Sequence, residues 1–508
     1  MKVSVGTGEL ERFRRVVAHR LGLHFENGKL GFLAEVLRRG LEANDGDLEA
    51  YLSPLEAGRS PHELRLLAQD LTVGETYFFR HMDQFRAFAE VALPERLRVR
   101  GTRNFCGSGP MLQILSAGCA SGEEAYSLAI LVRRASSEIA GRVSIRGVDV
   151  NPLALKKALR GRYSDWALRE TPQEVQRRWF RQDGREAVLN DSLRADVRFE
   201  DRNLLEEDPE LWQPEAYDII FCRNVIMYFT PESAQALMAR ITRAMAPGGY
   251  LFLGHAETLR GLSQDFHLRH THETFYYQRK DETWAPSPTN LPSASLPISV
   301  PARPAAIEIN GAWVDAIQEA TEKIRYLAAP PSESPAVVPG PRGDMRLALD
   351  FLQREQFSQA LSVIEQLPLE MAGDPDVLLL HAVLLTHSGQ LAIAEKTCRR
   401  LLAADDLNAG AHYVLALCRE GAGDRRGATE HDQIAVYLDP GFAMPHLHLG
   451  LVARRAGDRE TARRELEQAI ALLEREDASR LLLFGGGFKR EALIALCRAE
   501  LTACEVQR

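Results

Sequence analysis

Two consecutive glutamates, Glu123 and Glu124, follow a glycine loop in the stretch ILSAGCASGEEAYSLAI (114–130). An apolar run, a glycine turn and an amphipathic segment in this order predict a strand, a ligand-binding loop and a helix. The N-terminus of a helix carries a partial positive charge and attracts phosphate, which two carboxylates would repel. The pattern therefore favours a phosphate-free ligand with cationic groups.

Polar residues after two further predicted strands narrow the class of ligand. Asp149 ends the run VSIRGVDV, where a carboxylate typically accepts hydrogen bonds from ribose hydroxyls. Asn203 ends the run VRFEDRN and is suited to hold the edge of an adenine. A ribose, an adenine and no phosphate indicate S-adenosylmethionine (AdoMet), whose amino and sulfonium groups are cationic. Glu124 is the preferred contact for these groups, whereas Glu123 is better explained as a charge that supports the helix start.

An alternating α/β segment must position these residues. Between 111 and about 280, six apolar runs alternate with amphipathic helices, which predicts a mostly parallel sheet with helices on both faces. The runs are MLQILSAG, VSIRGVDV, VRFEDRN, YDIIFCRN, GYLFLGHAE and TFYYQRK. An insertion at 164–196, with a helix and a small hairpin, interrupts the alternation at a place suited to substrate selection. Residues 9–70 have the apolar spacing of helices.

The C-terminal third of the chain contains repeats. Gly389, Gly423 and Gly457 are 34 residues apart, and alanines at 360, 394, 428 and 462 keep the same period. Such a period, with small residues at fixed helix contacts, is typical of tetratricopeptide repeats. We predict repeats over 343–478 and a capping helix over 479–508. A proline-rich linker at 281–342, with one possible helix, precedes them.

Bulk composition argues against several functional classes. The 508 residues carry a net charge of −8, so the chain has no basic footprint for nucleic acid. It contains no apolar run long enough to span a membrane and begins without the apolar core of a signal peptide. Its seven cysteines are scattered without a CxxC pair, which favours reduced thiols. We expect a cytoplasmic protein without bound metal, nucleic-acid partner or membrane insertion.

Five motifs occur in a fixed order along the first 258 residues: LTVGETYFFR (71–80), GCASGEEAYS (118–127), DVNPLALKKA (149–158), FCRNVIMYF (221–229) and GHAET (254–258). Together they closely resemble the CheR family of chemotaxis receptor methyltransferases. The resemblance covers about 9–280, and the repeats resemble those of members fused to tetratricopeptide arrays. It implies an N-terminal helical domain (1–82), a Rossmann-like AdoMet-dependent methyltransferase domain (83–280) and a C-terminal all-α repeat domain.

The resemblance also implies an activity and a set of contacts. Family members transfer a methyl group from AdoMet to glutamates on the cytoplasmic helical bundle of chemoreceptors, giving glutamyl methyl esters and S-adenosylhomocysteine. The cofactor contacts carried over to matching positions are Thr76, Arg80, Glu124, Asp149, Asn203, Leu204, Arg223 and Asn224. Gly74 replaces the usual asparagine, so that contact would be lost or taken by backbone or water. The receptor-reading hairpin maps to about 180–196 and is several residues shorter than in members that grip a receptor's tether peptide.

Methylation of a glutamate places few demands on proton transfer. The carboxylate is ionised at pH 7, so the reaction needs in-line positioning in a dry pocket and no general base. Arg80 suits a bidentate hold on a carboxylate, either that of the substrate or that of AdoMet. Tyr228 is predicted to reach the reacting carboxylate, the alternative being an aromatic packed in the core. The residues predicted to be structural are Phe78, Phe79, Cys119 and His255.

Two other functions stay open at this point. One is a small-molecule methyltransferase, against which the block LTVGETYFFR argues, because the bare methyltransferase fold has no role for it. The other is a scaffold that binds AdoMet, or nothing, while its repeats recruit partners. In either case we expect the array to bind a peptide or helix on its concave face, from another chemosensory component or from the linker.

Overall fold

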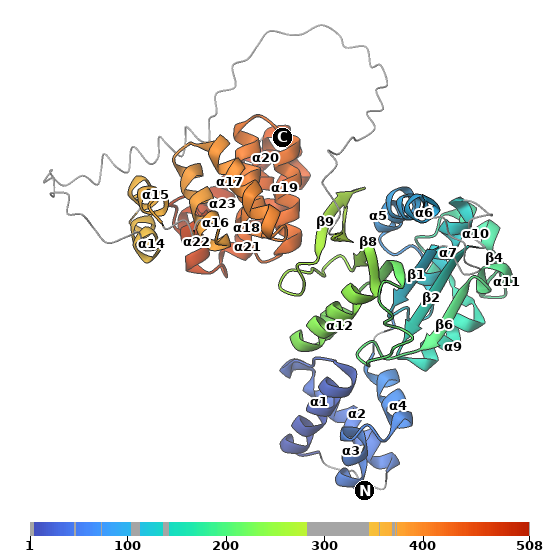
Figure 1. Cartoon of the computed structure of the whole chain (residues 1–508). Coiled ribbons are helices and arrows are strands. Elements are labelled where there is room, and N and C mark those ends of the chain that lie inside the picture. The colour runs from blue at the N-terminus through green and yellow to red at the C-terminus, as the bar shows by residue number, and fades with distance from the viewer. Residues whose placement is uncertain are drawn as a thin grey trace, which may run out of the picture. The chain divides into compact units, whose positions relative to one another are not determined.

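The computed structural model describes residues 5–44, 47–72, 74–102, 112–135, 142–281, 345–354, 356–367, 371 and 373–506. The chain forms two compact units, Met1–Trp284 and Ala285–Arg508 (Figure 1). From residue 282 onward, the predicted linker and its possible helix lie outside the described residues.

The first unit begins with helices packed around one apolar core. They are α1 (Thr7–Leu21), η1 (Asn27–Lys29), α2 (Leu30–Ala43), α3 (Leu48–Glu56) and α4 (Pro61–Leu71). Phe13, Leu33 and Leu52 are fully buried in this core, which confirms the helical spacing seen in the sequence. Asp47 caps α3 by accepting hydrogen bonds from two backbone N–H groups of its first turn.

A seven-stranded sheet forms the body of this unit, in the order β6-β2-β1-β7-β8-β10-β9. Its strands are β1 (Leu112–Ala117), β2 (Val143–Asp149), β6 (Val197–Asp201), β7 (Tyr217–Cys222), β8 (Met245–Leu253), β9 (Phe266–Thr271) and β10 (Thr274–Arg279). The five strands from β6 to β8 are parallel, whereas β10 is antiparallel to both its neighbours. All six predicted strands form, and β9 is an additional edge strand.

The strand order changes direction between β1 and β7. From β1 the chain moves outward to β2 through α7 (Glu123–Ala135), and from β7 it moves the opposite way to β8 through α12 (Pro231–Ala244). Right-handed crossovers in opposite directions place these helices on opposite faces of the sheet. The carboxyl ends of β1 and β7 therefore flank a topological switch point, where open α/β sheets bind ligands.

The remaining helices of this unit flank the sheet or lie in its insertion. They are α5 (Met82–Ala87), η2 (Phe88–Ala92), α6 (Leu93–Thr102), α9 (Pro152–Arg160), η3 (Asp165–Leu168), α10 (Gln173–Trp179), α11 (Asp191–Arg194) and η4 (Ile226–Tyr228). A separate three-stranded sheet pairs β3 (Arg162–Ser164) and β4 (Phe180–Asp183) with β5 (Glu186–Leu189). Only two residues join β4 to β5, and Gly184 there has a φ of +64°. The insertion thus contains a short, tight hairpin.

Helix pairs form the second unit. They are α14 (Met345–Gln353) with α15 (Phe357–Glu365), α16 (Pro375–His387) with α17 (Leu391–Ala404), α18 (Ala409–Gly421) with α19 (Arg425–Leu438), and α20 (Ala443–Ala456) with α21 (Arg459–Leu473). Gly389, Gly423 and Gly457 all have positive φ between paired helices, as the period requires. Where one capping helix was predicted, the structure has two, α22 (Ala478–Phe484) and α23 (Arg490–Val506).

The fold class expected from the sequence is confirmed for both units. A mixed Rossmann-like sheet follows a helical domain, and repeated helix pairs follow in the second unit. In the described part of the chain, no helix combines the length and apolar character that crossing a bilayer requires.

Candidate active site

The loop after β1 is shaped by close contact with the loop after β7. Gly118 has a φ of +74°, and a Cβ at this position would lie 2.4 Å from Cγ2 of Val225. Ala120 also has a positive φ, +46°, which is unusual for a residue with a side chain. The two loops thus meet at the switch point, and glycine is required where they touch.

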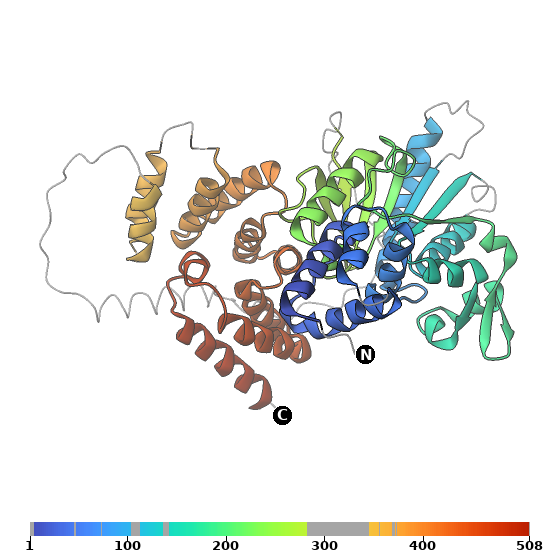
Figure 2. The same ribbon diagram turned by 90° about the horizontal axis from the view of Figure 1, so that it is seen from below.

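The N-terminal helical domain docks on the same end of the sheet (Figures 1 and 2). The backbone N–H of His24 donates to the carbonyl of Tyr228 at 2.7 Å, and that of Thr230 donates to Gly22 at 2.9 Å. Asn151 Nδ2 donates to Thr72 Oγ1 at 3.0 Å. The helical domain therefore completes one wall of the region beside the strand ends.

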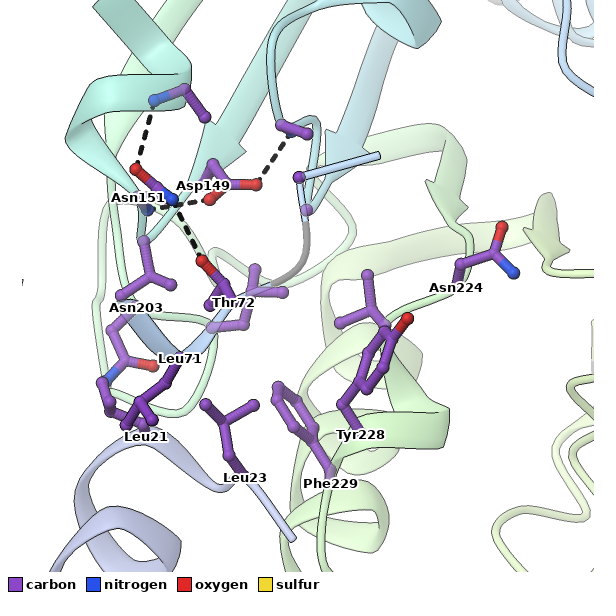
Figure 3. Close-up of a pocket in the computed structure, with 17 residues that line it drawn as sticks. Leu21, Leu23, Leu71, Thr72, Asp149, Asn151, Asn203, Asn224, Tyr228 and Phe229 are labelled. Atoms are coloured by element: carbon purple, nitrogen blue, oxygen red, sulfur yellow. Dashed lines mark hydrogen bonds between the residues drawn. The ribbon is translucent and has the colours of Figure 1, made fainter. Parts of the chain in front are cut away.

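A pocket lies between the helical domain and the strand ends (Figure 3). Its empty space is about 790 Å³, including the solvent at its mouth. The helical domain contributes apolar side chains, and the strand ends contribute polar ones. The residues that line it include Leu21, Leu23, Leu71, Gly118, Asp149, Asn203, Leu204, Asn224, Tyr228 and Phe229. This combination of an apolar wall with a few polar groups is typical of sites for small organic ligands.

Asp149 lies in this pocket and is held by the backbone. One carboxylate oxygen accepts a hydrogen bond from the N–H of Ala120 and the other from that of Asn151, both at 2.8 Å. Burial raises the pKa of this carboxyl above its ordinary value, while the backbone donors oppose that shift. A carboxylate has about four acceptor positions, so Asp149 retains acceptor capacity for ligand hydroxyls.

Asn203 has a structural task that the sequence did not reveal. Its Nδ2 donates to the carbonyl of Arg20 in the helical domain at 2.9 Å, and its Oδ1 accepts from the N–H of Leu205 at 3.0 Å. The amide is thereby fixed at the domain contact, with one N–H left for a ligand. Leu204, almost fully buried, lines the pocket beside it.

Glu124 and Arg223 form a buried ion pair. Glu124 Oε2 lies 3.2 Å from Arg223 Nη1, and its Oε1 accepts from Ser116 Oγ at 2.7 Å. Burial raises the pKa of Glu124 and lowers that of Arg223. Arg223 Nη2 also donates to the carbonyl of Arg80 at 2.5 Å. Neither Glu124 nor Arg223 is among the pocket-lining residues, so the pair lies beside the main pocket.

Arg223 has one buried donor without a partner. Within the described residues, no hydrogen-bond acceptor is placed for its Nε. A buried, unpartnered N–H on a charged group is costly, and it marks a position where a ligand oxygen would be stabilised. The Arg80 guanidinium donates to the carbonyl of Glu75 at 3.2 Å and lies 5.8 Å from the centre of the Tyr77 ring. Thr76, half-buried between these two residues, is not among the pocket-lining residues.

Glu257 organises the loop after β7. Its carboxylate accepts hydrogen bonds from the backbone N–H groups of Asn224 (2.6 Å), Gly254 (2.7 Å), Val225 (2.8 Å) and Met227 (3.2 Å). Asn224 has a φ of +57°, a conformation that needs such support. Glu257 was not among the predicted site residues, although an acid in GHAET, shortly after an apolar strand, was a usable signal. Asn151, whose amide links the two domains, was not predicted either.

The other predicted residues fall into two groups. The Tyr228 ring is half-buried and faces the pocket from the side of η4, on the same side as Asn224 (Figure 3). The predictions of structural roles for Phe78, Phe79 and Cys119 are confirmed, because all three are buried. His255 stacks on His81 with ring centres 5.6 Å apart. Burial, assisted by Arg223, lowers the pKa of His81 to about 4.

These groups fit AdoMet. Gly118 has no Cβ and so lets the loop after β1 lie close to the loop after β7 at the edge of the pocket. Asp149 offers acceptors for ribose hydroxyls, and the Nε of Arg223 offers a donor for a carboxylate. The apolar wall suits a nucleobase. Within the part of the chain that the structure describes, no group of three or more His, Cys, Asp or Glu residues is arranged to hold a metal ion.

Comparison with solved structures gives a likeness for the repeats. A tetratricopeptide-repeat protein of Thermus thermophilus is 24% identical and covers 32% of this chain and 90% of its own, with a TM-score of 0.25. The 34-residue period and the helix pairs are the basis on which we assign these repeats.

Comparison with protein families and curated proteins identifies the first unit. Residues 74–275 match the family described as CheR methyltransferase, SAM binding domain. Chemotaxis protein methyltransferase 2 of Vibrio cholerae is 32% identical over 272 residues, which are 53% of this chain and 91% of that protein. The probable biofilm formation methyltransferase WspC of Pseudomonas putida is 28% identical over 464 residues, 90% of this chain and 97% of that protein. The chain therefore belongs to the CheR family and is an AdoMet-dependent methyltransferase of chemotaxis-like signalling.

Proposed function

We propose that this chain methylates glutamate side chains on the cytoplasmic helical bundle of a chemoreceptor. The observation that carries the proposal is the convergence of the predicted motifs around one pocket. Residues from 71–74, 118–120, 149–154 and 224–229 line it, and Glu257 of the fifth motif holds the last of these segments in place. The helical domain, which a bare methyltransferase fold lacks, supplies one wall. This arrangement favours a protein acceptor over a small metabolite.

The assignment of cofactor contacts follows from the chemistry of each group. Bound AdoMet supplies a methyl group activated by a sulfonium. Asp149 would accept the ribose hydroxyls, Leu204 and the remaining N–H of Asn203 would contact the adenine, and Glu124 would face the amino cation. Thr76 and Asn224 complete the proposed contacts at the segments that approach the pocket from either side.

In this proposal two arginines bind two different carboxylates, that of AdoMet and that of the substrate glutamate. The unpartnered Nε of buried Arg223 suits the carboxylate of AdoMet, because the ion pair with Glu124 already fixes its guanidinium. Arg80 is half-buried, and its guanidinium is held by a single carbonyl, so it has donors to spare for the incoming substrate glutamate. Arg80 would thus bind the acceptor, and Arg223 the donor.

The chain's residues then act by positioning and by excluding water. Tyr228 faces the pocket while its carbonyl is tied to His24, so its ring is held between the two domains. From there its hydroxyl would orient the acceptor carboxylate. Leu23 and Phe229, joined by a backbone bridge, close the apolar side of the pocket. A dry pocket favours the reaction, because charge disappears as carboxylate and sulfonium react.

The receptor system is a finer part of the proposal. The relative that matches along both units is named a probable biofilm formation methyltransferase. Because this match includes the repeats, we propose that the receptor belongs to a chemosensory system that controls surface attachment. Loss of the chain would then change biofilm formation while swimming behaviour stays unchanged. The reverse result would assign the receptor to a motility system.

Radiolabelled AdoMet tests the chemistry directly. Incubation with a purified cytoplasmic receptor fragment should give methyl incorporation that is released as methanol by mild base, as expected for a glutamyl ester. Tyr228→Phe should lower kcat with little change in the affinity for S-adenosylhomocysteine, and Tyr276→Phe, a buried tyrosine of β10 away from the pocket, serves as the matched control. Label that withstands base, or activity on free metabolites alone, would refute the proposed acceptor.

A further inference from the structure

Residues 474–489 connect the last helix of the repeats to the C-terminal helix α23, and on the way they extend along the array toward its first repeat. Helix α21 ends at Leu473, and α23 begins at Arg490 and packs against α21 and α20. Between them, α22 contacts α14 and α16, which belong to the first and second helix pairs (Figure 1). A segment anchored at the last repeat therefore reaches back to the first. We refer to residues 477–488 of this excursion as the plug.

The plug touches the first helix, or its start, in every pair. Besides α14 and α16, its Phe484 ring lies 5.9 Å from that of Tyr413 in α18 and 5.0 Å from that of Phe442, the N-cap of α20. Leu482, Leu483 and Phe484 pack on the apolar cluster of the first repeats. A segment that contacts the first helix of each pair lies along the surface these helices share, which is the concave binding surface of such arrays.

The groove is shaped for an aromatic ring at the position of Phe484. A Cβ on Gly410 would lie 2.7 Å from Cζ of Phe484, so a larger residue here would displace the ring from its present position. The equivalent positions of the neighbouring repeats carry Asp376 and Met444. Gly410 lies in the first turn of α18, and the absence of a side chain there provides space for the plug.

A charged contact fixes the other end of the plug. Arg480 pairs with Asp439 at 2.5 Å, and its guanidinium lies 5.0 Å from the centre of the Phe442 ring. Arg480, Leu483 and Phe484 are three and four residues apart, so they share one face of the helix. The groove thus recognises a cation followed by two apolar side chains at helical spacing.

Several features make the plug separable from the array. A helix of seven residues has little stability of its own, and Leu482, Leu483 and Phe484 are only half-buried. Gly486 and Gly487, which follow it, have positive φ. Glu476 accepts a hydrogen bond from the N–H of Ala443, and its carbonyl accepts one from Arg490 Nη2. These bonds fix the base of the excursion to the array without involving the plug itself.

We propose that the plug occupies the groove as an internal competitor of a partner protein. The partner is an amphipathic helix that presents a basic residue followed, three and four positions later, by leucine and phenylalanine. It binds only when the plug has left, so the apparent affinity of the groove scales with the open fraction. The repeats therefore select partners that outcompete a covalently tethered helix.

Binding of a plug peptide in trans tests this proposal on the full chain. The probe is a fluorescein-labelled peptide of residues 477–488, followed by fluorescence anisotropy. Leu483→Ala combined with Phe484→Ala should bind it at least about tenfold more tightly than wild type, because the weakened plug opens more often. Adding Gly410→Met should abolish this gain. Leu496→Ala, an exposed leucine of α23, is the matched control and should behave as wild type.

Hydrogen exchange of the unaltered chain gives a second measurement. Amides of α22 should exchange at least about tenfold faster than those of α18, because the plug opens without unfolding the repeats. Equal protection of the two helices would overturn the proposal. So would a folded Leu483→Ala, Phe484→Ala variant that binds the peptide no better than wild type. In either case the plug is a permanent part of the core.

Discussion

The pocket of the first unit is open, whereas the groove of the second unit is occupied by a segment of the chain itself. In the first unit the pocket is open and lined by polar groups at strand ends, and nearby Arg223 has an unpartnered buried donor within the described structure. In the second unit the groove is filled by the chain's own leucines and phenylalanine. The first arrangement stores unsatisfied hydrogen-bonding capacity for a small polar ligand. In the second, the chain covers its own apolar groove, so that a partner protein can bind there only by displacing the plug.

Asp149→Ala should have the largest effect of the changes considered in the first unit, a loss of cofactor affinity. It removes the proposed ribose acceptor and leaves the N–H groups of Ala120 and Asn151 without their carboxylate. Loss of the two proposed hydrogen bonds from the ribose hydroxyls to this charged group should lower the affinity for S-adenosylhomocysteine about 100-fold or more. Calorimetric titration measures it, with Asp183→Ala on the β4–β5 hairpin as control. Unchanged affinity would remove Asp149 from the cofactor site.

Glu257→Gln should disrupt the hydrogen bonds that hold the loop after β7, although Glu257 is not itself a proposed ligand contact. The amide has one oxygen for four backbone donors, and its own NH₂ group would face some of them. We expect a loss of about 2 kcal/mol in the free energy of unfolding and a lower kcat. Urea denaturation and methyl-transfer assays measure the two effects. A stable variant with normal kcat would show that the loop after β7 holds its shape without this carboxylate.

The polar half of this contrast was largely readable from the sequence. Asp149 and Asn224 end apolar runs, and such residues are poor core material, so their position at the switch point followed from the strand pattern. The engagement of Asn203 with Arg20 was not predictable, because it depends on how the helical domain docks. The four-donor role of Glu257 depends in the same way on the contact between two loops that are 30 residues apart in sequence.

The apolar half was readable only in part. The 34-residue period predicted the helix pairs, because small residues recur wherever two helices approach closely. The plug has no period, and the run LLLF next to three glycines looks like the start of a cap. Its true position emerges only when α22 is seen against α14 and α16. Local pattern identifies elements, whereas long-range packing decides where an aperiodic element goes.

His448 provides a pH test of the second unit. It is buried between Asp432 (2.6 Å) and Glu420 (2.7 Å), and Glu420 also pairs with Arg455. Burial opposes its protonation, but the two carboxylates prevail and raise its pKa to about 10. A raised folded-state pKa stabilises the fold fully below the ordinary value of about 6.5, and this stabilisation is lost as pH rises toward 10.

We therefore expect the helical repeats to lose about 3–4 kcal/mol of stability between pH 6.5 and 9.5 through this residue. Urea denaturation followed by circular dichroism, at several pH values, measures the loss. His448→Asn should be less stable at pH 6.5 and should lack this part of the pH dependence. A variant with the same slope as wild type would assign the alkaline loss to other groups.

Removal of residues 282–508 should have the smallest effect of all on the methyl-donor pocket. Every residue that lines the pocket lies between 21 and 229, and the CheR family match ends at 275. Substitutions at sites that share no partners act independently, so the affinity of the first unit for S-adenosylhomocysteine should stay within about twofold of the full chain. Titration of both chains tests this expectation. A tenfold loss would mean that the second unit supports the pocket, and that the two surfaces are coupled where we treat them as separate.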